Sequence, residues 1–74
     1  MRSELLEQVV RDCVQDIGDP LFVHILRRCE AACPWTNVEE VKAVVRGMVN
    51  RGVLHMREDP VDHDWTYRKG PKWT

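Results

Sequence analysis

The chain is predicted to fold as one α+β domain, with three helices followed by a two-stranded antiparallel β-hairpin. Its 74 residues and 43% hydrophobic content suit a single small domain. Hydrophobic residues recur at helical spacing in three segments that end before Gly52. After Gly52 the hydrophobic period changes from about 3.6 to about 2, which is typical of β-strands.

The first helix is predicted over residues 3–17. Ser3 is a favoured N-cap residue, and Glu4 and Glu7 suit the positive end of the helix dipole. The hydrophobic stripe of this helix consists of Leu6, Val9, Val10, Cys13 and Ile17. We expect Gly18 to end the helix in a C′ position.

The second helix is predicted over residues 20–33. Asp19 is a favoured N-cap residue, and Pro20 suits the first helical position because an N–H there would have no partner. The hydrophobic face consists of Phe22, Ile25, Leu26, Cys29 and Cys33. Pro34 disfavours the α conformation of the residue before it, so the helix should end near Cys33.

The third helix is predicted over residues 37–51. Thr36 and Glu39 match a capping box at its start, and Gly52 closes it. The buried stripe consists of Val38, Val41, Val45, Met48 and Val49. Because most of these residues are β-branched, packing rather than helix propensity must hold this helix.

The hairpin follows Gly52. Leu54 and Met56 should point to one side of the first strand, and the returning strand should place Trp65 and Tyr67 on one face. The predicted connecting loop, residues 58–64, contains Pro60 and four acidic residues, which are Glu58, Asp59, Asp62 and Asp64. We expect residues 1–69 to form the domain and residues 70–74 a short C-terminal tail.

Composition limits the function classes. A chain of this length can hardly enclose a deep catalytic pocket, so we expect no enzyme. The formal net charge of −1 is unusual for a domain that only grips phosphates. No apolar run approaches a membrane span, and the segment from Met1 to Glu4 does not look like a secretory signal. We therefore expect a cytoplasmic protein without a membrane partner.

The cysteines are expected to be structural. Cys13, Cys29 and Cys33 make an odd number, which argues against a disulfide framework. Cys29, Cys33 and His24 share a helix, but the close Cys-x-x-Cys spacing of zinc sites is missing. Free cysteine usually behaves as a small core residue, so we expect no metal and no cofactor.

Two segments carry a resemblance to a known superfamily. They are Val38-x-x-Val41 through Val45-x-x-Met48-Val49-Asn50-Arg51-Gly52-Val53-Leu54, and Trp65-Thr66-Tyr67-Arg68. The first resembles the third helix and first wing strand of winged helix-turn-helix proteins, and the second resembles their returning strand. The resemblance implies a winged-helix fold with the hairpin as the wing. Transcription regulators, phage excision and repressor proteins, and protein-docking domains share this fold, so the function stays open.

The first functional hypothesis is a small DNA-binding transcription regulator whose third helix enters the major groove of double-stranded DNA. Lys42, Arg46 and Asn50 stand on one helix face, and Arg and Asn suit bidentate contacts with base edges. Small Ala43 and Gly47 would permit a close approach. The expected phosphate contacts are Arg51, Arg57, Arg68 and Lys69. One domain offers few contacts, so a homodimer would be expected.

The second hypothesis is a protein-interaction module, such as a phage-type adaptor or inhibitor. The carboxylates of the hairpin loop would be repelled by a phosphate backbone, whereas an acidic tip suits a basic protein surface. The expected protein contacts are Trp35, Glu58, Asp59, Asp62 and Asp64. The near-neutral charge favours this hypothesis, and the basic third-helix face favours DNA binding.

Overall fold

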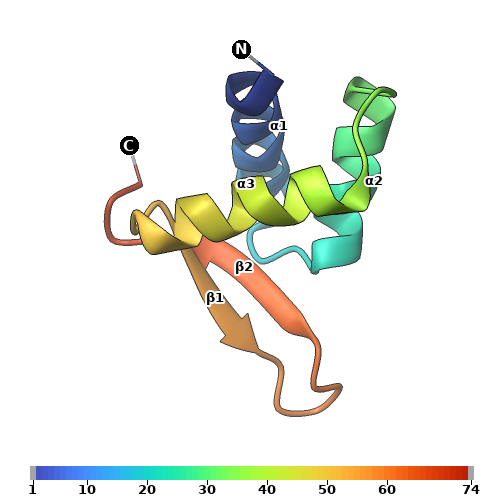
Figure 1. Cartoon of the computed structure of the whole chain (residues 1–74). Helices are drawn as coiled ribbons and strands as arrows, with labels where there is room; N and C mark the ends of the chain where they lie inside the picture. The colour runs from blue at the N-terminus through green and yellow to red at the C-terminus, as the bar shows by residue number, and fades with distance from the viewer. Residues whose placement is uncertain (1, 74) are drawn as a thin grey trace.

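The computed structural model describes residues 2–73. Its elements are α1 (Arg2–Ile17), α2 (Phe22–Ala32), α3 (Val38–Asn50), β1 (Leu54–Glu58) and β2 (Trp65–Lys69). The helices gather at one end of the molecule, and the hairpin projects from beneath α3 (Figure 1). The predicted fold class, α+β with a three-helix bundle followed by a β-hairpin wing, is confirmed.

The hydrophobic core lies between the three helices and the base of the hairpin. It consists of Leu6, Val10, Cys13, Val14, Ile25, Cys29, Cys33, Val41, Val45, Met48, Leu54 and Tyr67. Four predicted stripe residues are partly buried and pack against this core, namely Val9, Phe22, Leu26 and Val49. Two others are exposed, Ile17 by 45% and Val38 by 39%. Ile17 ends α1 and Val38 begins α3, so both stand at the edge of the bundle. Within residues 2–73, no helix is long and apolar enough to cross a membrane.

The predicted start of the second helix was wrong. The N-cap of α2 is Leu21 rather than Asp19, and Leu21 N donates a hydrogen bond to His24 Nδ1 (3.3 Å). The hairpin explains the shift, because Leu21 is extended and forms an antiparallel bridge with Thr66. Pro20 and Leu21 therefore form a short extended edge beside β2, and the helix begins only after it. At its other end, α2 stops at Ala32, one residue before the predicted end.

The predicted caps of the other two helices also differ. Ser3 lies inside α1, which already includes Arg2. The N-cap of α3 is Asn37, whose Oδ1 accepts a hydrogen bond from Glu40 N (2.9 Å), so the predicted capping box at Thr36 was wrong. Asparagine is at least as good a cap as threonine, and its use moves the helix start by one residue.

The helix stops at glycine are confirmed. Gly18 and Gly52 follow α1 and α3 with φ of 96° and 80°, a left-handed conformation that disfavours other residues. Gly70 is needed for another reason, since a Cβ there would lie 2.3 Å from Gly52 O. This close approach lets residues 70–73 fold back on the domain, where Lys72 N donates to Gly52 O (2.9 Å). Residues 70–73 of the predicted tail are therefore packed against the domain, and Thr74 lies outside the described residues.

The register of the hairpin decides which side chains face the helices. Met56 pairs with Tyr67 and Glu58 pairs with Trp65, so the loop is residues 59–64 rather than 58–64. Directly paired residues share a face of a sheet. The inner face, which packs against the helices at its base, carries Leu54, Met56, Glu58, Trp65, Tyr67 and Lys69. The outer face carries His55, Arg57, Thr66 and Arg68. The prediction that both aromatic residues share one face is confirmed.

Candidate binding groove between the third helix and the hairpin

A groove of about 720 Å³ lies between α3, the inner face of the hairpin and the start of α2. We call it the α3–hairpin groove. Lys42, Arg46 and Asn50 line it from α3. The side chains that line it from the other elements include Val23, Met56, Trp65, Tyr67 and Asp64. The groove is therefore polar on its helix side and largely apolar on its hairpin side.

The polar wall carries two cations. Lys42 and Arg46 are four residues apart, so they lie on one face of α3, and both are exposed. Neither makes an ion pair with another residue of the range 2–73. Burial raises the pKa of the Tyr67 phenol, and the positive charge of Arg46 partly offsets this rise. Arg46 therefore acts electrostatically on the base of the groove as well as on its rim.

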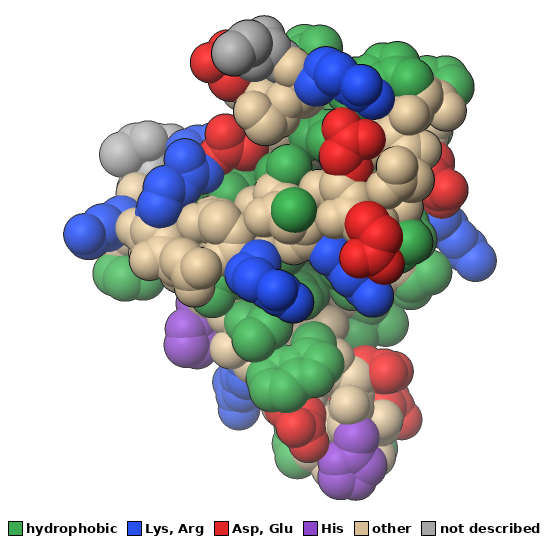
Figure 2. All heavy atoms as spheres, viewed as in Figure 1, with side chains coloured by type: hydrophobic (Ala, Val, Ile, Leu, Met, Phe, Trp, Pro, Cys, Tyr) green, Lys and Arg blue, Asp and Glu red, His purple; other side chains and the backbone are tan. Residues whose placement is uncertain are grey.

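The apolar floor is made of side chains that the core does not bury. Val23 is 42% exposed, Met56 40% and Trp65 46%. Figure 2 shows basic side chains along the lower edge of α3, directly above a hydrophobic area on the hairpin. Acidic and histidine side chains occupy the tip below that area. A hydrophobic patch bordered by charged groups is typical of a surface that binds a partner.

The predicted DNA-contact residues are only partly brought together. Lys42, Arg46 and Asn50 share the groove wall, as expected from their spacing. Arg57 and Arg68 lie on the outer face of the hairpin, directed away from the groove, because side chains alternate along a strand.

The other two predicted phosphate contacts are engaged within the molecule. Arg51 makes an ion pair with Glu7 of α1. The Lys69 ammonium lies 5.5 Å from the centre of the Trp73 ring, which is also 5.3 Å from the Arg11 guanidinium. The seven residues predicted to contact DNA therefore do not form one surface.

The acidic tip is an ordered turn. Asp59 Oδ1 accepts a hydrogen bond from Val61 N (2.8 Å), and Glu58 Oε1 lies 3.2 Å from His63 Nδ1. These carboxylates are used to shape the loop, whereas Asp62 projects from it and Asp64 lines the groove. Two of the four predicted acidic contacts, Glu58 and Asp59, therefore interact within the turn, and the other two, Asp62 and Asp64, are exposed.

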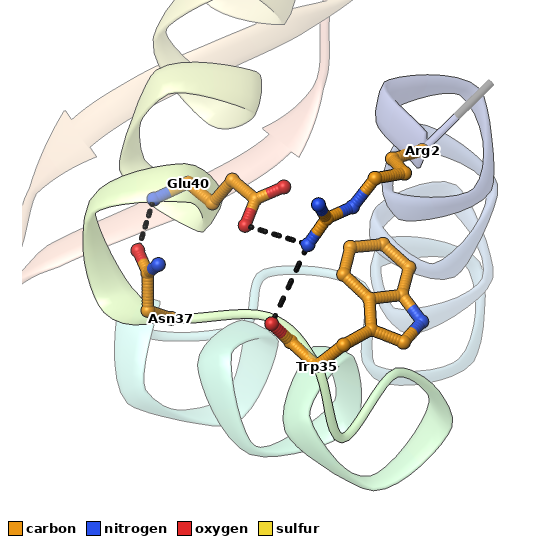
Figure 3. Close-up of polar contacts among 4 residues, drawn as sticks. All are labelled: Arg2, Trp35, Asn37 and Glu40. Carbon is orange, nitrogen blue, oxygen red and sulfur yellow. Dashed lines mark hydrogen bonds and ion pairs between the residues drawn. The ribbon is translucent and has the colours of Figure 1, made fainter.

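Trp35 lies at the junction of α2 and α3, outside the groove lining. The Arg2 guanidinium sits 4.1 Å from the centre of its ring (Figure 3). Arg2 Nη2 also lies 3.5 Å from both Trp35 O and Glu40 Oε1. These contacts tie the start of α1 to the start of α3, and Trp35 is separate from the acidic tip.

The cysteines pack in the core. Cys13, Cys29 and Cys33 are buried and free. Burial raises the pKa of the Cys29 thiol to about 11 and also raises the pKa of Cys13, so the reactive thiolate is disfavoured at neutral pH. Within residues 2–73, no group of three or more His, Cys, Asp or Glu side chains is arranged to hold a metal ion.

Comparison of the chain with family models, with curated proteins and with solved structures finds no match. The winged helix-turn-helix resemblance therefore stays a prediction, based on the order of the elements. The groove must be interpreted from its own chemistry.

The floor of the groove does not follow from the sequence pattern. The sequence places Leu54 with Met56 and Trp65 with Tyr67, and the register joins both pairs on one hairpin face. That face extends beyond the bundle, and its outer half, with Met56 and Trp65, stays exposed. Val23 falls outside the predicted hydrophobic face of the second helix. The available signal was Val23, a hydrophobic residue away from the predicted stripe of the second helix, together with a long hydrophobic face on the hairpin.

Proposed function

We propose that this chain is a protein-interaction module whose α3–hairpin groove binds an acidic and partly hydrophobic segment of a partner protein. One observation carries the proposal, namely that two cations without ion pairs, Lys42 and Arg46, stand beside a half-exposed apolar floor. A peptide with a carboxylate near the cations and a hydrophobic side chain on the floor would contact the polar wall and the apolar floor at the same time.

The apolar floor favours a protein partner over duplex DNA. A DNA backbone offers phosphates, and base edges offer few apolar groups besides the thymine methyl. Trp65 and Met56 would gain little from such a surface. Burying one large aliphatic side chain contributes about 1.5–3 kcal/mol, which a hydrophobic peptide residue on this floor could supply. Tryptophan and arginine are also the residue types that most often dominate protein interfaces.

Charge supports the same choice. The chain has a formal net charge of −1, whereas duplex-binding domains usually carry a basic excess. Non-specific DNA binding depends on the number of phosphates that cations neutralise. Only Lys42 and Arg46 are free cations on the groove wall, too few for a stable duplex complex.

Selection from a random peptide library displayed on phage tests the proposal. The wild-type chain should enrich peptides that combine acidic and hydrophobic residues. A K42E/R46E variant should lose them, and Trp65→Ala should weaken them by about tenfold, the equivalent of 1.4 kcal/mol. The matched control is R57E/R68E, which makes the same charge change on the outer face and should keep full binding. No enrichment over the K42E/R46E variant would overturn the proposal.

DNA binding is the second candidate, and Gly47 is the observation that favours it. A Cβ at Gly47 would meet no atom within 4 Å, so nothing inside the domain requires glycine there. Glycine in a helix interior costs about 0.5–1 kcal/mol relative to alanine. Together with Ala43, it leaves a smooth strip on α3 that permits close approach of a major groove.

A mobility-shift titration with mixed-sequence duplex at two salt concentrations decides between the candidates. DNA binding predicts a complex at low salt that Lys42→Glu abolishes. No shift at micromolar protein and low salt would exclude DNA binding and leave the protein partner.

A further inference from the structure

We propose that a second copy of this chain occupies the α3–hairpin groove, with each copy inserting its hairpin tip, residues 59–64, into the groove of the other. The inference rests on the proposed function, because it uses the same groove chemistry. It adds the identity of one ligand, which would compete with any foreign partner.

The tip carries the chemistry that the groove is suited to bind. Val61 is 81% exposed, more than any other large hydrophobic side chain in residues 2–73. Asp62 follows it, and the Asp62 carboxylate makes no ion pair or hydrogen bond with another described residue. An exposed valine beside an unpaired carboxylate complements an apolar floor beside two unpaired cations.

The tip is held in the shape that presents these two side chains. Asp59 Oδ1 binds the Val61 amide (2.8 Å), and His63 N donates to Asp59 O (2.8 Å). His63 takes the left-handed conformation, with φ of 59°, which turns the chain back toward β2. Asp59 N donates to Asp64 O (2.7 Å) and closes the loop. A preorganised loop loses less conformational entropy when it binds.

The groove that receives the tip belongs to another copy. The tip continues the strands that line its own groove, and the exposure of Val61 shows that it does not fold back into that groove. Each chain has one tip and one groove, so two copies related by a twofold axis satisfy both contacts at once. The formal net charge of −1 leaves little repulsion between copies. The small contact predicts a weak, reversible dimer.

Sedimentation velocity of the full chain, from about 10 μM to about 1 mM, tests this arrangement. The wild type should form a dimer that weakens with added salt. Asp62→Lys reverses the charge of the tip, and K42E/R46E reverses the charge of the groove wall. Each variant should weaken the dimer by at least about tenfold. An equimolar mixture of the two variants should dimerise again, because the lysine tip meets the glutamate groove and the native tip meets the native groove.

The control is again R57E/R68E, which should dimerise like the wild type, and circular dichroism confirms that each variant folds. A wild type that stays monomeric at about 1 mM would overturn the inference, as would a mixture that fails to dimerise. Equal weakening by R57E/R68E would overturn it too, because the contact would then lie elsewhere. If the peptide selection succeeds while the chain stays monomeric, the second copy is excluded as a ligand and the proposed function stands. If the chain dimerises but the selection enriches no peptide, the foreign partner is excluded.

Discussion

The helix bundle and the hairpin use their hydrophobic residues differently. In the bundle, α1 and α2 bury most of their hydrophobic stripes, as Leu6, Ile25 and Cys29 illustrate with no exposed surface. In the hairpin, only Leu54 and Tyr67 are buried, both toward its base. Hydrophobic side chains further along the hairpin remain open to solvent. The bundle therefore provides stability, and the hairpin together with α3 provides a surface, so substitutions should separate the two properties.

The largest expected effect on stability comes from a substitution in the core of the bundle. Ile25→Ala should lower the free energy of unfolding by about 2–5 kcal/mol, because it leaves a cavity in a closely packed core. Met56→Ala on the open hairpin face should cost less than about 1 kcal/mol while weakening peptide binding. Urea denaturation monitored by tryptophan fluorescence measures the free energy of unfolding of both variants. Equal losses from the two substitutions would contradict the division between bundle and hairpin.

The next effect concerns pH. Burial raises the pKa of Cys29 from 9.0 to about 11, so the folded state holds this proton more tightly than the unfolded state. The resulting stability is complete below pH 9 and is lost as the pH rises from 9 to about 11, on the order of 2 kcal/mol. Cys29→Ala should have a flatter stability profile over this range, measured by denaturation at each pH. Parallel profiles would show that the thiol is not shielded from solvent.

A smaller effect is expected from the ion pair between α1 and the end of α3. Arg51→Gln should cost about 0.2–1 kcal/mol, since the Arg51 side chain is 56% exposed and screened by solvent. The cost should shrink at high salt. Thermal unfolding at low and high salt measures this. A loss above about 2 kcal/mol, insensitive to salt, would mean that Arg51 supports the fold in another way.

An effect of similar size has the opposite sign. Gly47→Ala should stabilise the fold by about 0.5–1 kcal/mol, because alanine favours the helix and its methyl group meets no other atom. Ala43→Gly, one turn earlier on the same exposed strip, is the matched control and should destabilise by a similar amount. Thermal unfolding of both variants tests this. A destabilised Gly47→Ala would show that α3 is packed more tightly than its surface indicates.

The sequence predicted the elements well because each has a clear period. The three helices and the change of period at Gly52 were read from the spacing of hydrophobic residues alone. The start of α2 could not be predicted from the sequence, because Pro20 and Leu21 pair with β2. Local capping preferences do not indicate such a contact between distant segments.

The candidate site was half predictable. Lys42, Arg46 and Asn50 share a helix face by spacing, and they were identified together. The groove floor was not, because it depends on where the hairpin lies relative to α3 and α2. Alternation along the strands predicts that Arg57 lies on the other face from Met56, and Arg68 on the other face from Tyr67. Which of the two faces meets α3 depends on the same placement of the hairpin.

Chemical-shift mapping by ¹⁵N NMR tests the central claim most directly. The labelled wild-type chain is titrated with the peptide that the library selection enriches most. We predict shifts concentrated at Val23, Lys42, Arg46 and Met56 and at the indole of Trp65, with the outer hairpin face unchanged. Shifts confined to Arg57 and Arg68, or to the surroundings of Trp35, would contradict the assignment of the α3–hairpin groove as the binding surface.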